Sequence, residues 1–319
     1  MGILKFILRR LVFGFVTLVI IAFVVFAISQ MLPSDPAQVF LGRDATPASL
    51  AAKRAELGLD RSKIHQFWDW FSHLFFHLDP GTSFSGEKIW DFMSDRVKNS
   101  LFLMVLCSAV SVPISVVLGA VAARRRDKAF DSVTSFVNLS LAAVPEFAIG
   151  VFLLVLFSTN VWKIFPAVTR IRPGEQPWDH LDSLVLPVAT LTLAVVPYVS
   201  RTMRASTIEV LESDYIEMAR LKGLSERRVL WRHALPNAIG PTLQVIALNV
   251  AYLVSGVVTI EYLFNYKGIS TALLDAVRAH NMPLVQFIAV FVAAIYVITN
   301  LFADVGTILV TPRLRTAMR

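Results

Sequence analysis

Charged residues are scarce in this chain: Asp, Glu, Lys and Arg make up 17% of its 319 residues, against about 25% in a typical soluble domain. Hydrophobic residues make up 55%, and the mean hydropathy is +0.63. Even a well-packed soluble domain buries only about three quarters of the surface that its chain exposes. The composition therefore excludes an ordinary cytosolic enzyme and a disordered chain, and it indicates a polytopic helical membrane protein.

The chain has little cysteine, and it lacks the common nucleotide-binding and catalytic motifs. Cys107 is the only cysteine, which excludes an intramolecular disulfide and a cysteine zinc cluster. No Gly-Lys dipeptide occurs, so the chain has no P-loop, and it contains neither His-Glu-x-x-His nor Gly-x-Ser-x-Gly. We therefore expect no catalytic residue, no metal site and no cofactor bound by this chain.

Long apolar runs are abundant. A helix needs about 20 apolar residues to cross roughly 30 Å of hydrocarbon, and six runs meet that length. Glu146 is the only charged residue within them. The six predicted spans are 11–28, 99–123, 132–162, 183–200, 234–260 and 281–303.

Basic residues in the short connections predict the orientation of the spans. They gather before the first span, between the second and third, between the fourth and fifth, and after the sixth. Positive residues of short loops favour the cytoplasmic side, so both termini should be cytoplasmic. The predicted organisation is a cytoplasmic N-terminus with the first span (1–31), an external insert (32–98), five further spans (99–308) and a cytoplasmic tail (309–319).

The external insert has an aromatic stretch that predicts a helix lying at the membrane interface. His65, His73 and His77 share one face of that helix. Histidines at this spacing are compatible with a metal site, but no carboxylate repeats at matching spacing, so an aromatic interfacial helix is the better explanation.

The cytoplasmic segment 201–237 is too rich in helix-forming residues for a simple connector. Residues 208–222 contain neither Gly nor Pro and predict a helix that ends at Gly223. Ser225 and Glu226 are typical of the start of a second helix. This pattern favours a docking site for a cytoplasmic partner over a solvated loop.

In the same segment, Glu217 and Ala219 are followed by Gly223, and the pair Leu235-Pro236 begins twelve residues later. With this spacing the segment resembles the EAA loop of membrane-spanning subunits of ATP-binding-cassette (ABC) importers, specifically the B-type permease of dipeptide and oligopeptide systems. Met218 and His233 depart from the usual Ala and Ile of that loop. Similarity to peptide permeases extends to the neighbouring Asp214 and Tyr215, and to segments near both ends of the chain. The residues that match the EAA spacing are Glu217, Ala219, Gly223, Leu235 and Pro236.

The resemblance implies a type I importer permease fold with six transmembrane helices, in a bacterial inner membrane. It implies a homologous C-type permease, two cytoplasmic P-loop ATPases or one fused ATPase, and an external solute-binding protein. ATP and Mg would be bound by the ATPases, and no nucleic acid is expected. The ATPase-coupling residues would be Asp214, Tyr215, Glu217, Ala219, Arg220, Gly223, Leu235 and Pro236. Peptides are the implied substrate, with nickel, haem or another small solute as alternatives.

Three polar residues inside spans are candidates for the translocation pathway. Glu146 is the strongest, because a carboxylate within the membrane is energetically costly and marks a functional site by default. Pairing with another permease chain or with the backbone is an equally good explanation. Gln244 and Asn249 are weaker candidates, since polar residues also hold helices together. A self-contained secondary transporter, with Glu146 as a proton relay, or a scaffold protein would need no EAA loop.

Overall fold

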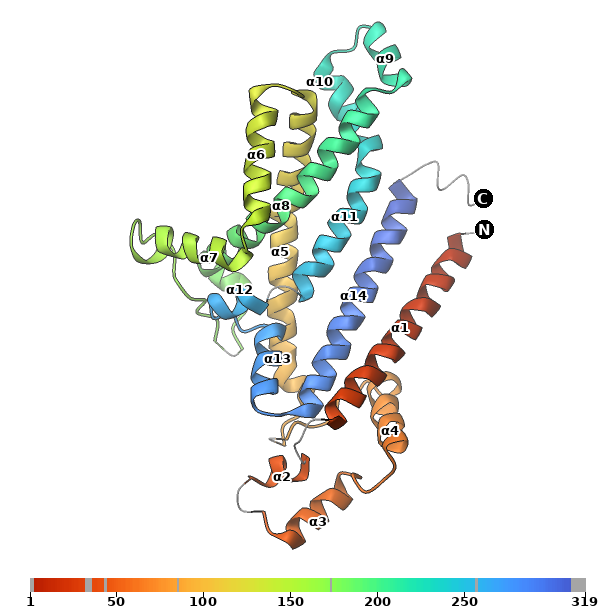
Figure 1. Cartoon of the computed structure of the whole chain (residues 1–319), viewed down its shortest axis with the longest axis vertical. Coiled ribbons are helices and arrows are strands. Elements are labelled where there is room, and N and C mark those ends of the chain that lie inside the picture. The colour runs from red at the N-terminus through yellow and green to blue at the C-terminus, as the bar shows by residue number, and fades with distance from the viewer. Residues whose placement is uncertain are drawn as a thin grey trace. The chain divides into compact units, whose positions relative to one another are not determined.

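The computed structural model describes residues 3–31, 36–42, 45–84, 86–172, 174–255 and 258–310 (Figure 1). Within these ranges the chain is helical and contains no strand, which confirms the predicted all-α class. The helices of the first third are α1 (Ile3–Met31), α2 (Pro36–Leu41), α3 (Pro47–Glu56), α4 (Lys63–Phe76) and α5 (Ile89–Arg124). The middle contains α6 (Ala129–Ala143), α7 (Glu146–Leu154), the π-helix η2 (Val155–Thr159), the 3-10 helix η3 (Pro177–His180) and α8 (Leu181–Leu211). The remainder comprises α9 (Asp214–Leu221), α10 (Glu226–Arg228), the π-helix η4 (Val229–Ala234), α11 (Leu235–Ser255), α12 (Val258–Leu263), α13 (Ile269–Arg278) and α14 (Met282–Val310).

Four helical stretches of the described residues are long and apolar enough to cross a membrane: Lys5–Met31, Ile89–Arg124, Pro177–Leu211 and Met282–Gly306. They correspond to four of the six predicted spans. A fifth crossing is obtained if α6 and the helical stretch Glu146–Thr159 count as one bent span. The run 234–260 is divided between α11 and α12 and does not appear among these stretches, so six crossings remain a prediction.

The predicted span 132–162 is not one straight helix. The helical stretch Glu146–Thr159 is turned by 101° from α6, and Figure 1 shows α7 running across the direction of α6. The turn occurs at Val144, whose backbone is extended (φ −93°, ψ 129°), and at Pro145, which precedes the first residue of α7. A proline ring disfavours the helical conformation of the residue before it, and proline has no N–H to continue the ladder. The run 132–162 therefore forms two helical stretches that meet at a sharp bend.

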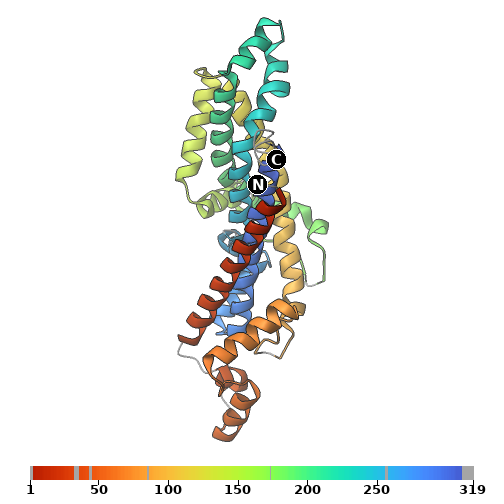
Figure 2. The same cartoon turned by 90° about the vertical axis from the view of Figure 1, so that its right-hand side faces the viewer.

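The described chain divides into two compact units. The first contains Leu101–Tyr266, the part of α1 up to Leu11 and the part of α14 from Ile298 onwards; the second contains Val12–Ser100 and Lys267–Val297. In the first unit, α8 packs against α6, α7 and α11 (Figures 1 and 2). In keeping with this central place, 72% of the residues in its most apolar stretch are buried.

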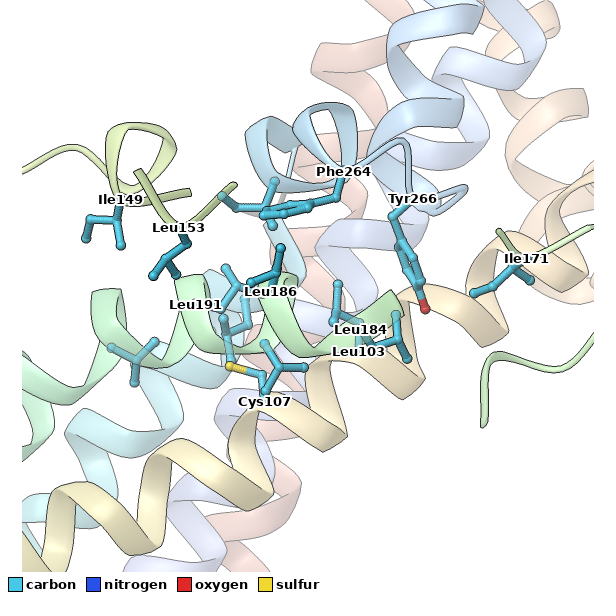
Figure 3. Packing of buried hydrophobic residues seen from close by; sticks show 14 of the residues in the cluster. Leu103, Cys107, Ile149, Leu153, Ile171, Leu184, Leu186, Leu191, Phe264 and Tyr266 are labelled. Atoms are coloured by element: carbon cyan, nitrogen blue, oxygen red, sulfur yellow. The ribbon is translucent and has the colours of Figure 1, made fainter. Parts of the chain in front are cut away.

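The core of the first unit brings α5, α7, α8 and the end of α12 together. Figure 3 shows Leu103 and Cys107 of α5 facing Leu184 and Leu191 of α8. Phe264 and Tyr266, which follow α12, complete the cluster and are fully buried. Because lipid tails are as apolar as leucine, close packing rather than exclusion from water holds such helices together.

The second unit packs the aromatic helix α4 against α1 and α14. Phe67 and Phe71 of α4 lie against Ala22 and Phe26 of α1 and Val290 of α14. The aromatic stretch is therefore a helix, as predicted. His65 contacts the Ser62 hydroxyl at the start of α4, whereas His77 lies just beyond its last residue.

Candidate functional site

The predicted coupling segment forms a chain of short helices between α8 and α11 (Figure 1). The predicted helix 208–222 is in fact divided, because α8 ends at Leu211 and α9 begins at Asp214. Ser213 separates them with an extended backbone, and its hydroxyl donates to the carbonyl of Val210. Serine commonly competes with helical hydrogen bonding in this way, and it favours helix starts.

Gly223 ends α9 as predicted, because its φ of +78° lies in the left-handed region. An L-residue pays a steric penalty there that glycine avoids. Ser225 precedes α10, as predicted from its identity, but makes no side-chain hydrogen bond to the helix. The chain then enters the π-helix η4, an uncommon conformation that often occurs at functional sites.

A small apolar core holds this segment in shape. Ile216 and Ala219 of α9 are buried against Val229, Leu230 and Ala234 of η4 and against Ala120 of α5. Leu235 packs at its edge, while Pro236 is exposed in the first turn of α11. The methyl group of Ala219 thus faces the interior of the segment.

One tyrosine ties the two ends of the segment together. The hydroxyl of Tyr215 donates to the carbonyl of His233 at 3.1 Å and accepts a hydrogen bond of 3.1 Å from the Asn237 side chain. Asn237 also donates to the same carbonyl at 2.8 Å. This network joins α9 to η4 and to the start of α11.

The outer face of α9 carries exposed charged and apolar side chains that make few contacts with other described residues. Asp214 and Glu217 are exposed and form no ion pair with any described residue. Met218 and Leu221 are 54% and 76% exposed. Arg220 differs, because it pairs with Glu226 at 2.9 Å. Exposed acids next to apolar side chains suit a protein partner with a basic surface.

Below the segment, an ion pair joins two helices. Arg204 of α8 donates hydrogen bonds of 2.6 Å from Nε and Nη2 to the two carboxylate oxygens of Asp131 in α6. The side chain of Asp131 is 5% exposed. A second pair, Arg126 with Glu212, links the α5–α6 turn to the end of α8 at 2.5 Å. The sequence analysis missed both pairs, because their members are far apart along the chain.

Two of the three predicted pathway residues line one cavity of the first unit. This cavity, of about 620 Å³, lies at the break between α6 and α7. Glu146 accepts a hydrogen bond from the hydroxyl of Tyr252, and Asn249 donates to the carbonyl of Val245 at 2.8 Å. Gln244 is exposed on α11 but does not line this cavity.

The sequence analysis did not select Tyr252, although a signal for it exists. Tyr252 follows Asn249 by three positions, and residues at that spacing share a helix face. Tyr198 of α8, which is 50% exposed, also lines the cavity. The arrangement therefore places a carboxylate, an amide and two phenols around one opening.

Comparison with known proteins gives a consistent result along the chain. Residues 115–316 match the family of binding-protein-dependent transport system inner membrane components, and residues 3–104 match its N-terminal domain. A probable peptide ABC transporter permease protein, y4tP of Sinorhizobium fredii, is 34% identical over 97% of this chain and 99% of its own length. A putative peptide transport system permease protein of Brucella abortus is 33% identical over 97% and 98%.

A third relative carries a more specific name. The glutathione transport system permease protein GsiC of Shigella flexneri is 31% identical over 98% of this chain and 99% of its own length. The family matches and the nearly full-length similarities agree with the resemblance found in the EAA segment and with the apolar helices. The chain belongs to the family of binding-protein-dependent transport system inner membrane components, the permease subunits of ABC transporters.

Proposed function

We propose that this chain is a permease subunit of an ATP-driven importer of short peptides and forms half of its translocation pathway. Membership of the permease family supports the transport role. Two of the relatives are named as peptide permeases and one as a permease for glutathione, itself a small peptide. The observation that carries the proposal is the α9–η4 segment, which combines the EAA spacing with exposed, unpaired Asp214 and Glu217.

The segment is proposed to dock a cytoplasmic P-loop ATPase. Glu217 would make a charge-assisted contact with a basic residue of the ATPase, and Met218 and Leu221 would add apolar contact. Gly223 and the small core around Ala219 keep α9 in a defined position. Two ATPases, or one fused ATPase, would bind ATP and Mg, because this chain contains no P-loop.

The remaining partners are a homologous C-type permease, which would supply the other half of the pathway, and an external solute-binding protein that delivers the peptide. We place the chain in the bacterial cytoplasmic membrane with six spans and both termini in the cytoplasm. The distribution of Lys and Arg supports this orientation. Residues 32–98 would then lie outside.

Transport would follow alternating access driven by ATP in the partner chains. Closure of the ATPase dimer would draw the α9–η4 segments of the two permeases together. The Asp131–Arg204 and Arg126–Glu212 pairs would pass that movement from α8 to α6 and to the α5–α6 turn. The cavity at Glu146 lies among these helices, and it would open to one side and then the other.

Purification of the tagged chain from its native host in mild detergent tests this proposal. A second permease and P-loop ATPases in stoichiometric amounts, with ATPase activity, are expected. A chain that purifies alone, shows no ATPase activity and performs ion-coupled uptake would instead be a secondary transporter.

Two variants make the test specific. Glu217→Arg should reduce recovery of the ATPase at least about tenfold, because a buried charge contact of roughly 1.4 kcal/mol or more would be lost. Asp60→Arg makes the same charge change at an exposed acid of the second unit, and it should retain the ATPase. Equal recovery with both variants would remove Glu217 from the contact.

A further inference from the structure

Two cavities of the first unit adjoin along α8 and α11. The first is the cavity at Glu146, and the second, of about 730 Å³, continues towards the end of α8. Tyr198 and Val245 line both of them, so the two form one groove. The groove runs between antiparallel helices, since α8 and α11 are joined by the α9–η4 segment.

An acidic group lies in the first part of the groove, and an unpaired basic group lies in the second. The carboxylate of Glu146 lies in the first part, held by the hydroxyl of Tyr252. Arg201 lines the second part, is exposed and forms no hydrogen bond or ion pair with any described residue. Arg204 is also in the second part, but both of its bonded nitrogens are directed to Asp131.

One further charge faces the second part. Glu209 follows Arg201 by eight positions on α8, which places it about 12 Å farther along the helix axis. It forms no ion pair with Arg201. The order of the unpaired charges along the groove is therefore Glu146, Arg201 and Glu209.

The spacing of the first two charges matches a short peptide. Tyr252, which contacts Glu146, lies about 10 Å along the α11 axis from Val245, which lines both parts of the groove. Arg201 lies about 5 Å along the α8 axis from Tyr198, which also lines both parts. These distances add, because the helices are antiparallel. The sum, about 15 Å, is the length of four to five extended residues at roughly 3.3–3.6 Å each.

We propose that this groove binds short peptides by their two free ends, with Glu146 at the α-ammonium group and Arg201 at the α-carboxylate. The inference rests on the proposed function as a peptide permease. The phenol rings of Tyr198 and Tyr252 add cation–π attraction for the ammonium group. The guanidinium fork of Arg201 offers paired donors to a carboxylate. The groove would thus recognise the two terminal charges that all short peptides share, and it would not select among peptide side chains.

Site-directed cysteine labelling tests the groove in native membranes that contain the assembled transporter. The only native cysteine, Cys107, is fully buried, so the unmodified chain measures background labelling. Leu248→Cys places a thiol in the first part, and Thr202→Cys places one in the second, next to Arg201 and seven positions from Glu209. The probes are a cationic and an anionic methanethiosulfonate reagent, and the competitors are tetraalanine and tetraalanine capped at both ends.

We expect the cationic reagent to label Leu248→Cys about tenfold faster than the anionic one, and Glu146→Gln to remove that preference. Thr202→Cys should prefer the anionic reagent until Arg201→Gln is added. Millimolar tetraalanine should slow both reactions, and capped tetraalanine should not. Absence of the charge preferences, equal protection by the two peptides, or protection by neither would overturn the inference. If the ATPase still purifies with the tagged chain in that case, the groove inference fails while the proposed function stands. If the ATPase does not purify with it, the proposed function itself fails.

Discussion

Arg204 holds Asp131 with two hydrogen bonds of 2.6 Å, one to each carboxylate oxygen, and so joins α8 to the first turn of α6. The carboxylate also accepts the backbone N–H of Asp127 at 3.1 Å. Both of its oxygens are therefore satisfied, although its side chain is almost fully enclosed. The pair ties the helix before the Pro145 break to the helix that leads into the α9–η4 segment.

Removal of the carboxylate should destabilise the protein strongly. Asp131→Ala leaves the Arg204 guanidinium partly enclosed and unpaired, which costs about 3–5 kcal/mol for buried pairs. Since the Arg204 side chain is 30% exposed, we expect the lower part of that range. Thermal unfolding of the purified transporter in detergent measures the change.

The exposed pair Arg126–Glu212 provides the control for that experiment. Its side chains are 49% and 64% exposed, and such pairs contribute at most about 1 kcal/mol. Arg126→Gln should therefore shift the unfolding midpoint much less than Asp131→Ala. Equal shifts would mean that burial does not strengthen the Asp131–Arg204 pair.

Gly119 marks a close approach of α5 to α8. A Cβ at this position would lie 2.5 Å from the carbonyl oxygen of Ser200 and 2.7 Å from the Cβ of Met203, and neither atom can move without its helix. Gly119→Ala should destabilise the protein by about 1–3 kcal/mol through overpacking. A Cβ at Gly306 of α14 would have no atom of the described residues within 4 Å, apart from its chain neighbours and the backbone of its own helix. Gly306→Ala should therefore be neutral or slightly stabilising in thermal unfolding, and similar losses in both variants would contradict the steric argument.

Gly223→Ala should weaken coupling rather than folding of the whole chain. Its φ of +78° would cost an alanine roughly 1–2 kcal/mol, which α9 can relieve by changing its direction. We expect loss of most of the ATPase stimulation by a ligand-loaded binding protein. Gly81→Ala has nearly the same φ, +81°, in the second unit. It should keep that stimulation, and unchanged stimulation in Gly223→Ala would separate the turn from coupling.

The hydrogen bonds of Tyr215 and Asn237 should act as one network. Tyr215→Phe removes the hydroxyl that contacts both the His233 carbonyl and Asn237, at an expected cost of about 0.5–1.5 kcal/mol. Asn237→Ala should cost a similar amount. Because the two share partners, the double variant should lose less than the sum of the single losses. Additive losses in thermal unfolding would show that the two side chains act independently.

Local signals in the chain predicted some features of the site. The absence of Gly and Pro from residues 208–222 predicted that a helix ends at Gly223, and the left-handed backbone of that residue confirms this. Glu146 and Asn249 were selected because polar groups are costly in a membrane, and both line one cavity. Gln244, selected for the same reason, does not. The energetic cost of placing a polar side chain in the membrane identifies candidate residues. It does not show on which side of the helix their partners lie.

The amino-acid sequence by itself determined the class of the protein, because the balance of apolar and charged residues, the length of the apolar runs and the spacing of the EAA segment are properties of the chain alone. Tertiary structure decided the rest. It set the 101° turn at Val144 and Pro145, where α7 packs across α8 instead of continuing α6. It also brought Tyr252 to Glu146 and Arg204 to Asp131, which are 106 and 73 positions apart. Such pairs depend on which helix faces meet, and the packing of the whole unit selects those faces.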